Sequence, residues 1–330
     1  MENRKKDHIN LAFQSQTPIN LLDNRFNYEP MLAAHPTGLK PFSFLGKEFH
    51  APLWVSSMTG GTELASKINR NLARACNEFG FGMGLGSCRA ILDDNTHLAD
   101  FDMRNIIGNG LPFFANLGIC QIEQLLEAKK TDKIIELIKR LQADGLIVHV
   151  NPIQEWIQPE GDRIKYPPID TIKRLLDLVQ FPVIVKEVGQ GIGPNSLYKL
   201  MHLPLAAIEF AAYGGTNFAE IERLRDSSAS HQLIEPLSKV GVDAYQMLEI
   251  TNHIHNEEKQ IQCKQLIISG GIKSFLDGYY LLQKSSLPAI YGQASSFLKY
   301  AREDYEQLQT YISAQIKGLE MAYAYLKIKP

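Results

Sequence analysis

Short apolar runs alternate along the chain with longer stretches in which apolar side chains recur at helical spacing. Eight runs of the strand type occur in order, at Leu53–Met58, Phe81–Gly86, Pro112–Leu117, Leu146–Val150, Pro182–Glu187, Ala207–Ala211, Gln265–Ser269 and Ala289–Tyr291. The clearest amphipathic stretch between them is Gln121–Leu141. Eight strands with intervening helices favour an α/β fold of the closed (β/α)8 TIM barrel type over the alternative, a doubly wound open sheet.

Two segments fall outside this repeat. Residues 1–50 form an N-terminal extension without a clear hydrophobic period, and residues 213–264 form a long insertion after the sixth strand, with polar clusters at Ser227–Ser230 and Asn252–Gln262. A connection of this length is usually a lid, an oligomer contact or partly disordered. We therefore expect one domain over residues 1–330 that carries both additions.

Composition narrows the class of protein. The net charge is −2, which argues against nucleic acid or a membrane surface as the partner. No apolar run reaches the roughly 18 residues of a membrane-spanning helix, and the basic N-terminus is not followed by the apolar region of a secretion signal. The four cysteines are widely spaced and form no CxxC pair. This spacing argues against a zinc site or disulfide framework and favours a reducing, cytoplasmic location.

Glycine-rich segments follow the last two predicted strands, where a barrel of this kind usually seats a phosphate. They are Ser269–Ile272, which contains Gly270 and Gly271, and Gly292–Ala294. Backbone without a Cβ atom can approach a phosphate closely, and the start of the following helix adds a favourable dipole. Either segment alone is more typical of a tight turn. Their pairing at the two expected places predicts a phosphate-bearing cofactor.

Lys186 lies within the apolar run Val183–Lys186, where nearly every side chain should be buried. A buried lysine is rare unless it is paired, because removing its charge from water is costly. At the end of a barrel strand it would face the cofactor, and a cation there can stabilise the anionic form of a reduced flavin. The alternative is a structural ion pair with Glu187 or another carboxylate.

A compact polar cluster follows the fourth predicted strand and contains His149, Asn151, Gln154, Glu155 and Gln158. The Glu155 carboxylate could hold a hard cation such as Mg²⁺, which often bridges to substrate phosphates. His149 could donate to phosphate or transfer protons. Each residue alone is more typical of a satisfied polar loop, but five of them within ten positions predict a site.

The N-terminus carries a basic arm made of Arg4, Lys5, Lys6 and His8. A solvated terminus is the ordinary interpretation of such a segment. The functional interpretation is a diphosphate clamp that becomes ordered over the substrate.

Seven motifs together resemble one family. They are RKKDHI at 4–9, SSMTGG at 56–61, NLG at 116–118, HVNPIQEWIQPEGD at 149–162, VKEVGQGI at 185–192, GGTNF at 214–218 and SGGI at 269–272. In this order they resemble the type 2, FMN-dependent isopentenyl diphosphate isomerases, over residues 4 to about 300. The specific part is HxNxxQE followed by QPEGD, whereas the glycine loops are shared with many FMN barrels.

The resemblance implies isomerisation of isopentenyl diphosphate to dimethylallyl diphosphate, with FMN, Mg²⁺ and a reductant such as NADPH. It implies a small-molecule diphosphate as the partner and a homo-oligomer, a tetramer or octamer. It assigns FMN binding to Met58, Thr59, Ser87, Asn116, Lys186, Thr216, Gly270, Gly271, Gly292 and Ala294. It assigns the substrate to Arg4, Lys5, His8, Arg89, His149, Asn151 and Gln154, the metal to Glu155, and catalysis to Gln154 and His149.

The chain departs from the family pattern at two positions, and two other functions stay open. Cys88 stands where the family usually has glutamine, and Lys273 stands where arginine is usual. One alternative is an FMN-dependent oxidoreductase of the 2-hydroxy acid oxidase type, which would need a histidine base near the end of the seventh strand. The other is a non-catalytic barrel that binds a phosphorylated ligand.

Overall fold

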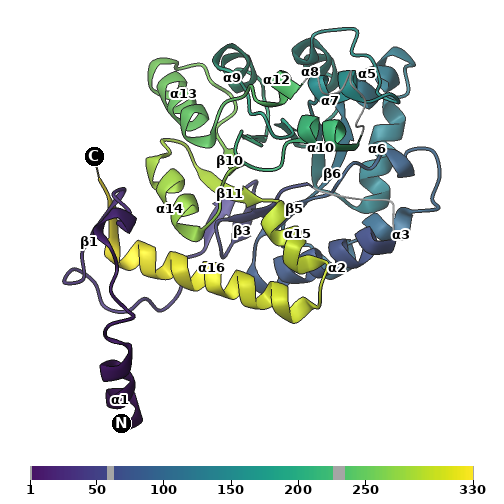
Figure 1. The fold of residues 1–330 in the computed structure, drawn as a ribbon. Helices are drawn as coiled ribbons and strands as arrows, with labels where there is room; N and C mark the ends of the chain where they lie inside the picture. The colour runs from purple at the N-terminus through teal and green to yellow at the C-terminus, as the bar shows by residue number, and fades with distance from the viewer. Residues whose placement is uncertain (1, 58–62, 226–234, 330) are drawn as a thin grey trace.

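The computed structural model describes residues 2–57, 63–225 and 235–329, and they form a closed barrel of eight parallel strands (Figure 1). Each predicted apolar run overlaps one strand, and three strands extend past the predicted bounds by one or two residues. Strand β11 pairs with β4 to close the barrel. The strands are β4 (Leu53–Val55), β5 (Gly82–Gly84), β6 (Phe113–Gly118), β7 (Gly145–His149), β8 (Val183–Lys186), β9 (Ala207–Glu209), β10 (Leu266–Ser269) and β11 (Ala289–Gln293). The predicted (β/α)8 TIM barrel is confirmed.

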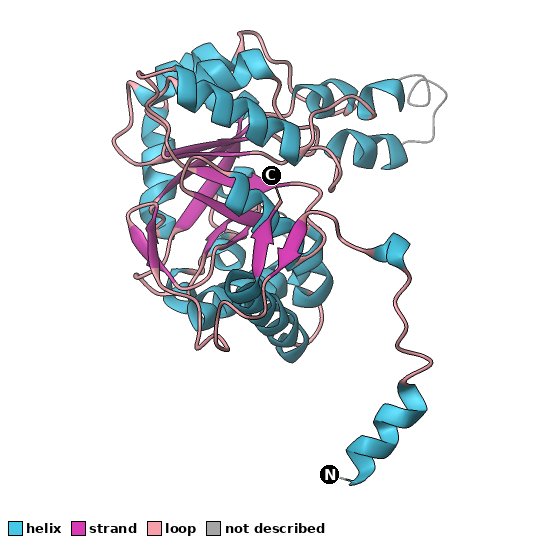
Figure 2. Ribbon diagram, turned by 90° about the vertical axis from the view of Figure 1, so that its left-hand side faces the viewer, coloured by secondary structure: helices cyan, strands magenta, loops and turns pink. Residues whose placement is uncertain are grey.

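Helices cover the outside of the barrel and bury the outward faces of the strands (Figures 1 and 2). The longer ones are α2 (Glu63–Phe79), α5 (Ile119–Glu127), α6 (Thr131–Leu141), α8 (Pro168–Leu176), α9 (Pro194–Met201), α13 (Ala244–Glu257), α14 (Phe275–Lys284) and α16 (Tyr305–Tyr325). The other helices include α3 (Leu98–Phe101), α4 (Arg104–Ile107), α7 (Pro152–Ile157), α10 (Phe218–Arg225), α12 (Glu235–Ser238) and α15 (Ser295–Ala301). None of the helices in the described ranges is long and apolar enough to cross a membrane.

The amphipathic stretch Gln121–Leu141 forms two helices rather than one. Helix α5 ends at Glu127, α6 begins at Thr131, and Lys129 between them has a φ of 56°. A residue in this left-handed region breaks the helical hydrogen-bond ladder. Both helices pack against β6, and α5 also packs against α8 and β7.

The N-terminal extension contains α1 (Glu2–Leu11), a short 3-10 turn at Ile19–Leu21 and three short strands. Helix α1 projects away from the barrel (Figure 2). Strand β1 (Phe26–Tyr28) pairs antiparallel with β12 (Leu326–Ile328), and β2 (Phe42–Phe44) forms a hairpin with β3 (Lys47–Phe49) directly before the barrel begins.

The segment 213–264 is more regular than the insertion that the sequence predicts. Helix α13 covers Ala244–Glu257, and its N-cap Asp243 accepts a hydrogen bond from the Gln246 amide. This helix takes the position of a barrel helix after β9, so the polar run that starts at Asn252 begins inside a helix. The Ser227–Ser230 cluster lies outside the described residues.

Candidate active site

Four neighbouring strands end in one row of chemically distinct residues. Strand pairing sets Gly118 opposite His149, His149 opposite Lys186, and Lys186 opposite Glu209. Residues in register on adjacent strands point to the same face of a sheet. The carboxyl ends of β6 to β9 therefore gather a glycine, an imidazole, an ammonium and a carboxylate at one level of the barrel.

A cavity of about 450 Å³ opens at these strand ends. Lys186 and Glu209 line it together with three glycine-rich loops. The loop residues are Gly214, Gly215 and Thr216 after β9, Gly270, Gly271 and Ile272 after β10, and Gly292, Gln293 and Ala294 at the end of β11. Six of the residues predicted to hold FMN thus line one cavity: Lys186, Thr216, Gly270, Gly271, Gly292 and Ala294.

The glycines of this cavity are required by backbone geometry. Gly270 has a φ of 94°, and a Cβ atom at this position would lie 2.1 Å from the Ala212 carbonyl oxygen. A Cβ atom on Gly292 would lie 2.5 Å from Ser56 Oγ, inside the cavity wall. The backbone can therefore come close to a ligand at these positions, as binding of a phosphate by amide groups requires.

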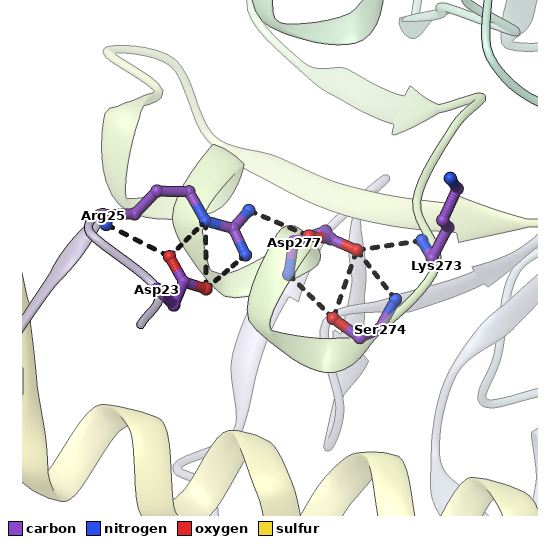
Figure 3. A network of polar contacts seen from close by, with 5 residues as sticks. All are labelled: Asp23, Arg25, Lys273, Ser274 and Asp277. Atoms are coloured by element: carbon purple, nitrogen blue, oxygen red, sulfur yellow. Dashed lines mark hydrogen bonds and ion pairs between the residues drawn. The ribbon is translucent and has the colours of Figure 1, made fainter. Parts of the chain in front are cut away.

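A polar network fixes the loop that follows Gly271 (Figure 3). Asp277 accepts hydrogen bonds from the backbone amides of Lys273 and Ser274, and its own amide donates to Ser274 Oγ in a capping box at the start of α14. Arg25 Nη1 lies 2.8 Å from Asp277 Oδ1 and ties this helix to the N-terminal extension. The side chain of Lys273 points away from the network, and within the described chain it forms no ion pair.

Lys186 is 5% exposed, and its contacts test the alternative of a structural ion pair. Its Nζ donates to the Glu187 carbonyl oxygen at 2.9 Å. The Glu187 carboxylate instead accepts the backbone amides of Gly189, Gln190 and Gly191. No carboxylate oxygen of the described residues lies within 4.0 Å of the ammonium, so the alternative of an ion pair with Glu187 is wrong. Burial lowers the pKa of Lys186, and Glu209 and Glu187 oppose this effect.

His149 is oriented by Asn116. The Asn116 amide nitrogen donates to the Leu85 carbonyl, so its Oδ1 is the acceptor that lies 2.7 Å from His149 Nδ1. This bonding assigns the proton to Nδ1 and leaves Nε2 as an acceptor near Gly118. Burial and the charge of Lys186 lower the pKa of His149 to about 3. His149 is therefore neutral at physiological pH and suited to accept a hydrogen bond rather than a proton.

The polar cluster after β7 is held together by its own hydrogen bonds. Asn151 Nδ2 donates to Gln154 Oε1 at 3.0 Å and to Glu155 Oε1 at 3.1 Å. Gln154 Nε2 in turn donates to Glu222 Oε1 at 3.0 Å, and Glu222 also accepts Gln158 and pairs with Arg225. The helices α7 and α10 thereby hold the Gln154 side chain in one orientation.

The surroundings of Glu155 fit a hard cation that takes further ligands from a substrate. Glu155 is buried, and its Oε2 accepts the Asp162 amide. Asn151 Oδ1, beside it, is a buried oxygen without a hydrogen-bond partner. Three or more His, Cys, Asp or Glu side chains do not come together as a metal cage anywhere in the described ranges. Mg²⁺ is often bound by one or two protein oxygens plus substrate phosphates, so these residues can hold it in that manner.

The remaining predicted site residues lie in different places. Arg89 is half exposed and pairs with Asp162 at 3.0 Å, which brings it to the Glu155 cluster. Ser87 is exposed and Asn116 is buried, and neither of them lines the cavity. Met58 and Thr59 lie outside the described residues. Arg4, Lys5 and His8 are on the exposed helix α1, which the structure does not bring to the site.

Cys88, at one of the two departures, is a buried thiol with its Sγ 3.5 Å from the Gly86 carbonyl oxygen. Burial raises its pKa to about 12, which leaves it protonated and without a charged role. Two carboxylates of the site were not predicted from the sequence. Glu222 orients Gln154, and Glu209 lies in the cavity wall.

The chain was compared with known proteins. It is 30% identical over 324 residues to an isopentenyl-diphosphate delta-isomerase of Rickettsia felis, which covers 96% of this chain and 90% of the relative. The chain belongs to the isopentenyl-diphosphate delta-isomerase family. The enzyme of the same name from Rickettsia africae is 32% identical over 84% of this chain and 78% of its own length. No protein-family model matches.

Solved structures support the fold of this family member independently. A mandelate oxidase with an FMN adduct superposes with a TM-score of 0.57 over 92% of this chain and 88% of its own, at 11% identity. A flavocytochrome b2 variant superposes with a TM-score of 0.61 over 96% of this chain and 81% of its own, at 12% identity. Identities this low show a shared barrel and leave the chemistry to the site residues.

Proposed function

We propose that this isomerase converts isopentenyl diphosphate to dimethylallyl diphosphate and that it uses reduced FMN and Mg²⁺. The proposal rests on the position of two features relative to each other. A glycine-walled cavity with a buried lysine lies at the same barrel end as the interlocked cluster of Asn151, Gln154, Glu155 and Glu222. The cavity suits a flavin phosphate and ring, and the cluster suits a metal-bound diphosphate.

The substrate explains why both parts are needed. Moving a double bond adds a proton at one carbon and removes a proton from another, and the diphosphate is the only polar group of the substrate. The diphosphate must therefore supply most of the binding energy, through the metal and basic residues. Reduced FMN, when bound, supplies electron density that stabilises positive charge at the reacting carbons.

The residues of this chain then have distinct tasks. Glu155 and Asn151 would hold Mg²⁺ on the diphosphate, and Arg89 would add a charge at the rim. Gln154 is hydrogen-bonded to both Asn151 and Glu222 and would set the position of the substrate's carbon chain. His149, neutral and bonded to Asn116, would accept a hydrogen bond at Nε2. Lys186 would keep a positive charge beside the flavin.

The 2-hydroxy acid oxidase alternative has less support. Such an enzyme needs a histidine base at the end of the seventh barrel strand, and in this chain β10 ends in Ser269, which is followed by Gly270 and Gly271. The residues of the described chain that line the cavity include no histidine.

The deciding experiment counts product against flavin reduced. Isomerisation has no net redox change, so the reductant is needed only to prime the flavin. Under anaerobic conditions, one equivalent of NADPH or dithionite per FMN should support many turnovers of isopentenyl diphosphate. An oxidoreductase would instead consume reductant, or yield reduced flavin, once for every product molecule formed. A ratio near one, without dimethylallyl diphosphate, would exclude the isomerase, and absence of flavin absorbance would exclude the cofactor.

A further inference from the structure

Glu209 is a fully buried carboxylate that the proposed chemistry leaves without a task. It is the last residue of β9, is 0% exposed, and lines the cavity together with Lys186. The run Ala207–Ala211 is otherwise apolar. Carboxylates are almost never fully buried without a partner, because desolvation of the charge is expensive. Its placement therefore requires an explanation.

The hydrogen bonds of Glu209 are only half complete. Ser269 Oγ donates to Glu209 Oε1 at 3.3 Å, and Ser269 is turned this way because its oxygen already accepts the Ala211 amide. Glu209 Oε2, Trp54 Nε1 and Ser56 Oγ have no hydrogen-bond partner among the described residues. Burial raises the pKa of Glu209, and the charge of Lys186 together with the nearby Ser56, Ser269 and Trp54 side chains opposes this effect. The charge state of this carboxylate therefore depends on the groups around it, and above all on the nearest cation.

The nearest opposite charge is Lys186, one strand away. The two residues are in register on β8 and β9, and each is the charge that most favours ionisation of the other. They are not a closed ion pair, because no nitrogen–oxygen contact within 4.0 Å joins them. Other titratable groups near them are His149 on β7, which is neutral, Glu187, which is engaged with backbone amides, and Lys273 at the cavity rim.

We infer that Glu209 is the positioning residue that keeps Lys186 protonated when the flavin is oxidised, and so sets how many protons accompany flavin reduction. The inference rests on the proposed flavin site. With oxidised flavin the ring is neutral, and Lys186 alone in this dry wall would lose its proton. With Glu209 present, Lys186 holds its proton before and after the flavin takes up two electrons. Reduction to the anionic form then binds one proton from solvent.

The first test measures the charge of Lys186 directly in the purified protein with oxidised FMN. Lysine is labelled with ¹³C at Cε, and the Lys186 signal is assigned by its loss in Lys186→Met. In Glu209→Gln the proton affinity of Lys186 should fall by roughly tenfold or more, because the opposing charge is gone. Glu209→Asp should restore most of it. Glu187→Gln, the same change at the other neighbouring carboxylate, should have a much smaller effect.

The second test measures proton uptake on anaerobic reduction with dithionite, in weak buffer with an indicator dye. At a pH between the Lys186 titration midpoints of wild type and Glu209→Gln, the variant should take up about one proton more per flavin, because Lys186 is then protonated only on reduction. The protons released when dithionite is oxidised are the same in both measurements and cancel in the comparison. A merely structural role for Glu209 would not change this number.

The outcomes separate the inference from the proposed function. Flavin bound, with an unchanged Lys186 titration and unchanged proton uptake in Glu209→Gln, would overturn the inference and leave the isomerase intact. If the purified protein binds no flavin, the proposed function and the flavin part of the inference both fail. If Glu209→Gln does not fold, Ser269→Ala tests the same link, because loss of the Oγ–H donor to Glu209 should shift the Lys186 titration in the same direction by less. No shift there would also overturn the inference.

Discussion

Asn116 Oδ1 lies 2.7 Å from His149 Nδ1, and this single hydrogen bond decides which nitrogen of the imidazole carries the proton. It joins β6 to β7 and leaves the other ring nitrogen as an acceptor. Because the ring is also desolvated beside Lys186, it stays neutral over the physiological pH range.

The low pKa of His149 predicts a specific acid sensitivity of the fold. The pKa is about 3 in the folded protein, below the ordinary value of 6.5, so the unfolded chain binds a proton first as the pH falls. The free energy of unfolding should therefore decrease as the pH falls from about 6.5 toward 3, by at most about 1.4 kcal/mol per pH unit from this residue. Above that range His149 contributes no slope. Urea unfolding of wild type and His149→Gln should differ in this slope, and equal slopes would contradict the assignment.

Glu155→Gln should lower isomerase activity by roughly 100-fold or more and raise the Mg²⁺ concentration needed, since losing even an outer-shell partner of a metal costs about 10- to 100-fold. Glutamine can still accept the Asp162 amide, so the loop should keep its fold and FMN should stay bound. Initial rates measured against Mg²⁺ concentration, with flavin absorbance as the control, test this. Near wild-type activity with the same Mg²⁺ dependence would remove Glu155 from the metal site.

Removal of residues 1–8 should raise the KM for isopentenyl diphosphate or abolish turnover while the barrel stays folded. Folding should persist because the side chains of residues 3–8 on α1 are exposed and the helix projects away from the barrel. Ile9 within the helix and Phe13 after it are also exposed, 71% and 84%, which suits an arm that packs against a second copy of the chain. Steady-state kinetics and sedimentation of the truncated protein test both points. An unchanged KM and kcat would make the arm a solvated terminus.

Two adjacent glycines should differ in their tolerance of alanine. Gly271→Ala should cost about 1–2 kcal/mol, because its φ of 73° is unfavourable for a residue with a Cβ atom but space is available. Gly270→Ala should cost more, since its Cβ would lie 2.1 Å from a backbone oxygen and the chain must move. Gly110→Ala, where a Cβ meets nothing within 4 Å, is the matched control. Urea midpoints and the FMN dissociation constant measure the effect, and equal losses at 270 and 271 would refute the argument.

The barrel could be predicted from the sequence because strands buried on both faces are continuous apolar runs, such as the one that ends at Lys186. The break after Glu127 could not, because it depends on the backbone angle of Lys129 rather than on the hydrophobic pattern. Lys186 was found because a charge in an apolar run is conspicuous. Glu209 carries the same signal in Ala207–Ala211 and was overlooked.

Glu222 had no comparable signal. It lies in the segment 213–264, which the polar composition marked as an insertion, and its contact with Gln154 joins residues 68 positions apart. Such a contact arises only when α10 packs against α7. The positions of Arg4, Lys5 and His8 also could not be predicted from the sequence. A motif gives the residue types of a site, but it does not show where the segment that contains them lies in the fold.

The pairing of β1 with β12 has a consequence for the order in which the protein assembles during translation. β12 follows all eight barrel strands in the chain, so the pairing partner of β1 does not yet exist while the ribosome synthesises the barrel. Arg25 precedes β1 and forms an ion pair with Asp277 at the start of α14. This ion pair would form late for the same reason. Segments that emerge first can fold before distant partners exist. The nascent chain would thus close its barrel first and fix the root of its N-terminal arm last.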